Sequence, residues 1–156
     1  MSKTAYTYTV LRYVHDTSTG EFINAGVVVH AREQRYLGVR MRHTHARLSA
    51  MFPDLDREAF RSSMRVMERA LKDLAEIYAK GDLFSVDADA VAMARTVLPA
   101  DDSSLQWSRV GGGLTANLAA TLDHLFERLV ARYDGKTERV KRTDEGMAPT
   151  AFGSQK

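Results

Sequence analysis

The sequence predicts an α+β fold, in which an antiparallel sheet of about four strands packs against two long helices and shorter ones. Three observations predict it. Residues 6–42 alternate segments rich in β-branched and aromatic side chains with clusters of turn formers. Two long stretches, in the middle and near the end of the chain, repeat apolar residues every three or four positions. A further alternating segment lies between them.

Three strands in an antiparallel meander are expected over residues 6–14, 22–31 and 36–42. The first is rich in tyrosine, threonine and valine, which suit a pleated and half-buried surface. The second contains three consecutive valines, a pattern typical of a strand that is covered on both faces. Polar turn formers fill residues 15–20 and 32–35, so each connection is short enough to join neighbouring strands.

The longest predicted helix is capped by Asp54 or Asp56 and runs to about Lys80. Its apolar residues follow one another at intervals of three and four, which places them on one face: Phe60, Met64, Met67, Leu71, Leu74 and Tyr78. Shorter helices are expected over residues 45–52 and 87–98, each stopped by a proline.

A fourth strand is expected over residues 105–110, followed by three consecutive glycines at 111–113. The glycines form either a plain hinge or a phosphate-cradling loop, although they lack the lysine of a Walker motif. The last helix is capped by Thr115 or Asn117 and ends before Gly135. Its expected inner face consists of Leu118, Leu122, Leu125, Phe126, Leu129 and Val130.

The 156 residues suit one hydrophobic core, and we expect a single α+β domain over residues 1–135 followed by a polar, mobile tail over 136–156. No run approaches the roughly 18 apolar residues of a membrane span. Residues 1–6 do not resemble a secretory signal, so a cytoplasmic protein without a membrane partner is expected. The absence of cysteine excludes disulfides, thiolate nucleophiles and cysteine-ligated zinc.

The hairpin between the first two strands carries the most distinctive residues. Glu21 is a charged residue at the mouth of an apolar strand, Asn24 is a polar residue inside it, and Gly26 allows a close approach. On a structural interpretation, Asn24 bonds to an edge or bulge and Gly26 relieves crowding. On a functional interpretation, the same residues line a binding or catalytic pocket.

Arginines from neighbouring strands, Arg12, Arg40 and Arg42, could converge near Glu21. Their planar donor groups suit phosphate or carboxylate recognition, whereas on a solvated sheet face they would form weak ion pairs. A second set of arginines recurs every four residues along the longest helix; it indicates a solvated face and only weakly supports nucleic-acid contact: Arg57, Arg61, Arg65 and Arg69.

Metal and catalytic motifs are not assembled in the sequence. His43 and His45 lie on one side of an extended segment, but no acidic neighbour completes a ligand spacing, so neither a metal nor a cofactor is expected. There is no nucleophile elbow, no His-Glu-x-x-His and no carboxylate pair at a telling spacing.

Two segments resemble a bacterial family of unknown function, domain-of-unknown-function family 3037. The first comprises Leu11-Arg12-Tyr13-Val14-His15-Asp16 and Gly20-Glu21-Phe22-Ile23-Asn24-Ala25-Gly26-Val27-Val28-Val29; the second, looser match comprises Leu105-Gln106-Trp107-Ser108-Arg109-Val110 with Gly113-Leu114-Thr115. Together they span about residues 6–133. His15 replaces the family's usual proline and Gly111 stands where a histidine is usual, so any role of that family position does not transfer directly.

The resemblance implies no established activity. Members of the family are often encoded beside kinases that resemble the HipA toxin, which implies an accessory role. Matching positions make four residues the best candidates for a functional face, namely Arg12, Glu21, Asn24 and Gly26, with weaker candidates in Gln106, Ser108 and Arg109.

Two hypotheses follow. The first is a non-enzymatic interaction module that binds a partner protein or a second copy of itself. The alternative is a phosphate-directed enzyme or a nucleotide- or nucleic-acid-binding protein that uses Arg12, Arg40 and Arg42, with Glu21 as acid or base. The second requires these four side chains to share one concave pocket.

Overall fold

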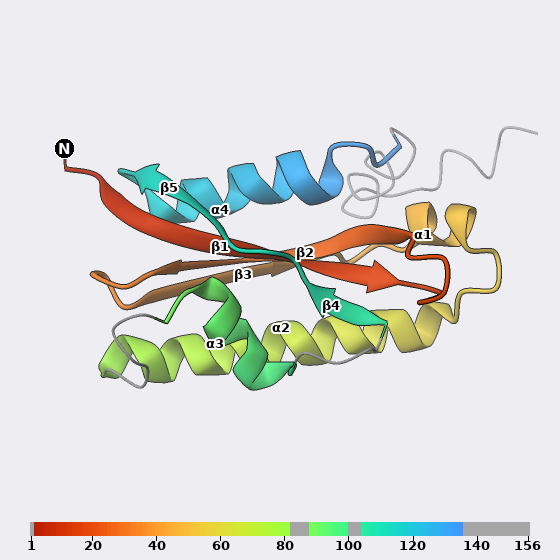
Figure 1. Ribbon diagram of the computed structural model, residues 1–156, viewed down its shortest axis with the longest axis horizontal. Coiled ribbons are helices and arrows are strands. Elements are labelled where there is room, and N and C mark those ends of the chain that lie inside the picture. Colours follow the sequence, from red (N-terminus) through yellow and green to blue (C-terminus); the bar gives the residue numbers. More distant parts are fainter. Residues whose placement is uncertain (1, 82–87, 100–103, 136–156) are drawn as a thin grey trace, which may run out of the picture.

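The computed structural model describes residues 2–81, 88–99 and 104–135, and it confirms the α+β fold (Figure 1). Its elements in chain order are β1 (Thr4–Val14), β2 (Phe22–Ala31), β3 (Tyr36–Met41), α1 (Ala46–Met51), α2 (Arg57–Lys80), α3 (Ala90–Val97), β4 (Leu105–Trp107), β5 (Gly111–Thr115), α4 (Leu118–Phe126) and the π-helical turn η1 (Glu127–Ala131). The expected start of α3 at Asp87 and the expected mobile tail over residues 136–156 lie outside the described residues.

The sheet is antiparallel, and the predicted meander β1–β2–β3 forms most of it. Both later strands lie along the other edge of β1: β5 pairs with its first half and β4 with its second half. The predicted fourth strand over residues 105–110 is therefore interrupted at residues 108–110, and the glycines at 111–113 belong to a strand rather than to a loop.

Tyrosine rings explain why the three glycines form a strand. Across the β1–β5 pair, Tyr8 lies opposite Gly111 and Tyr6 opposite Gly113. A Cβ atom would lie 2.5 Å from the Tyr8 ring at Gly111 and 2.8 Å from the Tyr6 hydroxyl at Gly113. The rings thus cover Gly111 and Gly113, an arrangement that stabilises glycine at a sheet edge. A Cβ at Gly112 would lie 2.8 Å from the backbone carbonyl oxygen of Tyr6.

The sheet forms the middle of three layers (Figure 1). α2 and α3 cover one face, and α1 lies at the end of the sheet and adds Leu48 to the core on that face. The larger apolar cluster there includes Leu11, Val28, Leu48, Phe60, Leu71 and Met93. α4 and η1 cover the other face, where the smaller cluster includes Val10, Val27, Val29, Leu125, Phe126 and Val130. β2 is buried on both faces, as its valines predict.

Side-chain caps fix where the main helices begin. Of the two predicted caps for α2, Asp56 accepts a hydrogen bond from the backbone N–H of Ala59 at 3.0 Å. α4 begins at Asn117, whose side chain accepts from the N–H of Ala120 at 3.0 Å. Asp54 instead contacts His15 at 2.8 Å. Within the described residues, no helix combines the length and the apolar character needed to cross a membrane.

A β-bulge in β2 sets the orientation of the hairpin residues. Leu11 lies opposite Gly26 while Arg12 lies opposite Asn24, so Ala25 is an extra residue on β2. A bulge reverses the alternation of side chains along a strand. Ile23 and Ala25 therefore pack into the larger cluster, and Asn24 turns toward η1.

Candidate functional site

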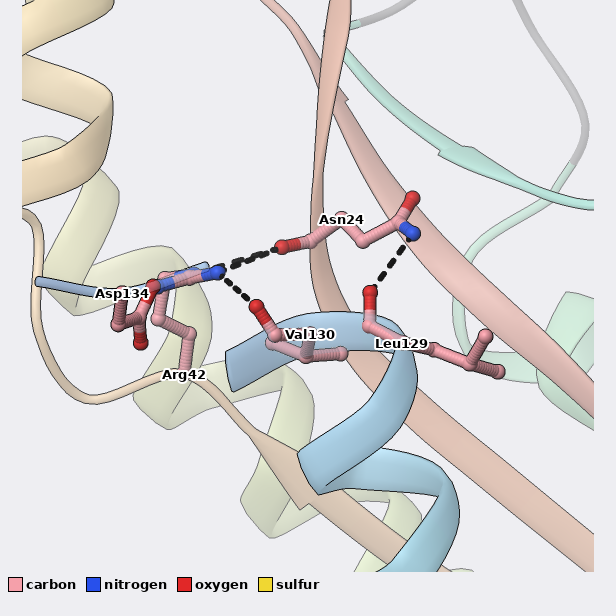
Figure 2. A network of polar contacts seen from close by, with 5 residues as sticks. All are labelled: Asn24, Arg42, Leu129, Val130 and Asp134. Atoms are coloured by element: carbon pink, nitrogen blue, oxygen red, sulfur yellow. Dashed lines mark hydrogen bonds and ion pairs between the residues drawn. The ribbon is translucent and has the colours of Figure 1, made fainter. Parts of the chain in front are cut away.

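Asn24 joins the bulge of β2 to the end of the C-terminal helix. Its side-chain Nδ2 donates to the carbonyl oxygen of Leu129 at 2.9 Å (Figure 2). Its Oδ1 is buried and has no hydrogen-bond partner among the described residues. The amide therefore satisfies a helix carbonyl with one end and leaves an acceptor with the other.

Arg42 lies on the same side of the sheet and is fully engaged in holding η1. Its Nη1 contacts Asp134 Oδ1 at 2.7 Å, and its Nη2 donates to the carbonyl oxygen of Val130 at 2.6 Å and to that of Asn24 at 3.2 Å (Figure 2). The side chains of Arg42 and Asp134 are only 1% and 8% exposed. Because helix ends leave carbonyls without intrahelical donors, Arg42 acts as a side-chain cap for η1.

Arg40 is also tied to the covering helix. Its Nη1 contacts Asp123 Oδ1 at 3.1 Å, and its guanidinium lies 4.1 Å from the ring centre of Phe126. Both partners belong to α4, so this arginine fastens β3 to that helix.

Arg12 differs from the other two arginines. Its guanidinium lies 4.3 Å from the ring centre of Phe22, and its Nε is buried without a hydrogen-bond partner. No carboxylate pairs with it in the described part of the chain.

Glu21 and Gly26 do not join these arginines. Glu21 is exposed in the turn, and its backbone N–H donates to the Thr19 hydroxyl at 3.3 Å. A Cβ at Gly26 would meet the side chain of Met41 and would lie 3.0 Å from the carbonyl oxygen of Arg40, so this glycine admits β3 rather than a ligand. Among the described residues, Glu21, Arg40 and Arg42 do not line any of three cavities of the structure, one of which Arg12 lines.

Arg12 and Asn24 instead meet in a cavity of about 360 Å³ between the sheet edge and η1, which we call the first cavity. Its lining comes from β1, β2, the interruption between β4 and β5, the first residue of β5, and η1: Tyr8, Val10, Arg12, Asn24, Ser108, Arg109, Val110, Gly111 and Leu129. None of these lining residues is an aspartate, a glutamate or a histidine.

Ser108 shapes the wall of the first cavity. Its hydroxyl accepts from the backbone N–H of Val10 at 2.9 Å and donates to the carbonyl oxygen of Arg109 at 3.0 Å. The backbone N–H of Ser108 still donates to the carbonyl oxygen of Val10 at 2.8 Å, so the serine hydroxyl replaces only the return bond of the strand pairing. Arg109 follows directly and also lines the cavity. The third weak candidate, Gln106, pairs opposite Arg12 in the sheet but is not part of the lining.

The histidines and the arginines of α2 lie elsewhere. His43 contacts Glu68 at 3.6 Å and His45 contacts Ser49 at 3.2 Å. Among the described residues there is no group of three or more metal-ligating side chains. The exposed arginines of α2 lie in the layer on the opposite side of the sheet from the first cavity.

A small relay near the end of β1 was not predicted. His15 joins the Tyr13 hydroxyl at 2.7 Å to the Asp54 carboxylate at 2.8 Å and stacks on Phe52. Burial, with a smaller contribution from Asp54, raises the pKa of Tyr13. The hydroxyl is therefore held neutral, and the relay ties β1 to the loop before α2.

The sequence interpretation also missed part of the first cavity. In the sequence, Tyr8 and Val10 resemble ordinary strand residues, and Leu129 belongs to the expected inner face of the last helix. The useful signal was the polar Asn24 inside an apolar strand.

The model of the family described as "Protein of unknown function (DUF3037)" matches residues 8–130. The chain belongs to this family. The match begins in β1 and ends in η1, so it contains every residue that lines the first cavity. No curated protein and no solved structure matches the chain. The family confirms the resemblance found in the sequence and assigns no activity.

Proposed function

We propose that the protein is a non-enzymatic binding module, acting in the cytoplasm, whose first cavity receives a phosphate group of its ligand. The carrying observation is that Arg12 and Arg109 both line one cavity and that no described residue lining it is an aspartate or a glutamate. A cavity with uncompensated positive charge attracts anions, and the planar donor fork of arginine matches the oxygens of phosphate.

Two buried polar atoms without hydrogen-bond partners among the described residues indicate which chemical groups the ligand offers. Within the described part of the chain, Arg12 Nε is a donor without an acceptor, and Asn24 Oδ1 is an acceptor without a donor. A buried polar atom without a partner costs about 1–3 kcal/mol, so a ligand that satisfies both gains affinity. A singly protonated phosphate offers both an oxygen and a hydroxyl, whereas an ionised carboxylate offers acceptors only.

Binding rather than catalysis is favoured by the same lining. Acid–base catalysis needs a titrating group within reach of the reacting atoms. Glu21, the residue expected to fill that role, is exposed in the turn and is not part of the cavity lining. A Glu21→Gln variant is therefore expected to bind phosphate as the wild type does.

Calorimetric titration of the full chain with inorganic phosphate and pyrophosphate, at constant ionic strength, tests the proposal. We expect saturable binding that Arg12→Gln or Arg109→Gln each weakens about tenfold or more, because a hydrogen bond to a charged group contributes about 1.5–3 kcal/mol. Arg65→Gln, an exposed arginine of α2, is the matched control. Succinate separates phosphate recognition from carboxylate recognition.

Equal loss of affinity in the Arg65→Gln control would contradict the proposal, since it would indicate non-specific charge attraction. Succinate binding as tight as phosphate binding would contradict the choice of phosphate.

A partner protein or self-association is a second candidate. Leu114 of the edge strand β5 is 67% exposed. Val110, which directly precedes this strand, is 45% exposed. Exposed apolar residues on a sheet edge favour pairing with another chain. Light scattering of the full chain should then give the mass of a complex, and Leu114→Lys should return it to a monomer. The accessory role beside a HipA-like kinase stays a prediction of the resemblance.

A further inference from the structure

A second cavity adjoins the first, and the two share Asn24 and Leu129 in their walls. It has a volume of about 290 Å³ and lies between the start of β2, α1 and the end of η1. Its lining consists of Phe22, Ile23, Asn24, Arg47, Arg128, Leu129, Val130, Arg132 and Tyr133.

The charge of the second cavity has one sign. Arg47 comes from α1, Arg128 from η1, and Arg132 from the turn after it. None of the lining residues is acidic. Because the first cavity adds Arg12 and Arg109, five arginines line the two adjoining cavities, and none of the described residues that line them carries a carboxylate.

Two accessible aromatic rings accompany these arginines. Phe22 is 42% exposed and carries the guanidinium of Arg12 against its ring. Tyr133 is 70% exposed, and the guanidinium groups of Arg47 and Arg132 lie 5.9 Å and 5.3 Å from its ring centre. Exposed rings beside guanidinium groups are platforms on which flat, unpaired bases stack.

We propose that the two cavities together bind single-stranded nucleic acid, a proposal that rests on phosphate recognition in the first cavity. The terminal phosphate of the strand, a monoester that offers a hydroxyl when singly protonated, contacts Arg12, Arg109 and Asn24. A base stacks on Tyr133, and the next phosphates contact Arg47 and Arg128. A duplex is disfavoured because its bases are already stacked on one another and present no free face. An acidic peptide would use the arginines but would gain nothing from the exposed surface of the two rings.

Fluorescence anisotropy tests this proposal with the full chain and a single-stranded octanucleotide, as RNA and as DNA, that carries a 5′-phosphate and a label at its 3′ end. Tyr133→Ala should weaken binding about tenfold, whereas Tyr133→Phe keeps the ring and should retain most of the affinity. Arg47→Gln combined with Arg128→Gln should weaken binding and reduce its salt dependence, because fewer counterions are released. Arg65→Gln is again the matched control, and thermal unfolding of each variant checks that it is folded.

The outcomes separate the two proposals. Phosphate binding without oligonucleotide binding would overturn this inference and leave the proposed function standing. If the protein bound neither phosphate nor the oligonucleotide, this inference and the proposed function would both be overturned. A duplex, a mononucleotide or an octamer of glutamate that bound as tightly as the single-stranded octanucleotide would contradict the proposal that one strand spans the two cavities. A Tyr133→Ala variant that bound the octanucleotide with wild-type affinity would contradict it as well.

Discussion

Arg12, Arg40 and Arg42 point to the same side of the sheet, yet their guanidinium groups have different surroundings. Arg40 and Arg42 meet the carboxylates of Asp123 and Asp134, whereas Arg12 meets the ring of Phe22. These partners lie 80 or more positions away for the first two and ten positions away for the third. The face could be predicted from strand alternation, but the partners depend on how the last helix docks.

Removal of Arg42 should be far more costly than removal of Arg40. Arg42→Ala leaves the Asp134 carboxylate buried without its partner, and loss of one member of a buried pair costs about 3–5 kcal/mol. Arg40→Ala breaks the ion pair with Asp123, whose side chain is 66% exposed. Exposed ion pairs contribute about 0–1 kcal/mol to the free energy of unfolding. Urea denaturation measures both. Equal losses would contradict the clamp assigned to Arg42.

His30 should make the protein less stable in mild acid. Its ring contacts the Tyr78 hydroxyl at 2.9 Å, and burial lowers its pKa. The unfolded state, with a pKa near the usual value of about 6.5, then binds more protons than the folded state as the pH falls below that value. The free energy of unfolding therefore has its full value, as far as His30 contributes to it, above about pH 7, and it decreases as the pH falls below about 6.5.

His30→Gln should flatten this dependence, because glutamine keeps a polar contact with Tyr78 and does not titrate. Denaturation curves between about pH 7 and 5.5 measure the slope of both proteins. The same slope in the variant would show that another group is responsible.

At the scale of elements, the bulge in β2 is what brings Asn24 to the helix-covered face. If β2 alternated regularly through Ala25, Asn24 would share the face of Gly26 and point into the larger apolar cluster. The sequence indicates that Asn24 is unusual, but a bulge depends on pairing between two strands and leaves no fixed local pattern. Asn24 combines features of the structural and of the functional interpretation. Its Nδ2 donates to the carbonyl oxygen of Leu129, and the residue also lines the first cavity.

Gly26→Ala should destabilise the sheet beside this bulge. The new methyl group would meet the Met41 side chain and the backbone of β3, and overpacking of this kind costs about 1–3 kcal/mol. Gly81→Ala, at the end of α2, meets no atom within 4 Å and should change stability by less than about 0.5 kcal/mol. Thermal unfolding of the two variants compares them directly. A Gly26→Ala protein as stable as Gly81→Ala would show that β3 can move away.

At the scale of the whole molecule, the elements were easier to predict than their assembly. Strand and helix periods placed the meander and α2 within a few residues, because these patterns are local. The split edge strand was missed, since the covering rings of Tyr6 and Tyr8 lie about 100 residues away from the glycines. Both cavities likewise combine the first 50 residues with the last 30 described ones, so their linings could not be derived from spacing.

The arrangement of the molecule explains where binding is possible. The α2 side of the sheet is closed by a large apolar cluster, whereas on the other side one short helix and its π-helical end leave the first cavity open beside them. The central claim is that an anion enters this cavity and contacts Arg12.

Nuclear magnetic resonance of the arginine Nε–Hε groups tests that claim most directly, because Arg12 Nε has no hydrogen-bond partner in the described protein. With increasing inorganic phosphate at constant ionic strength, the Arg12 signal should shift in a saturable way and the Arg109 signal with it. The Arg42 signal should stay in place, since its guanidinium already donates to Asn24, Val130 and Asp134. An Arg12 signal that does not move, or that moves equally with chloride, would contradict the account.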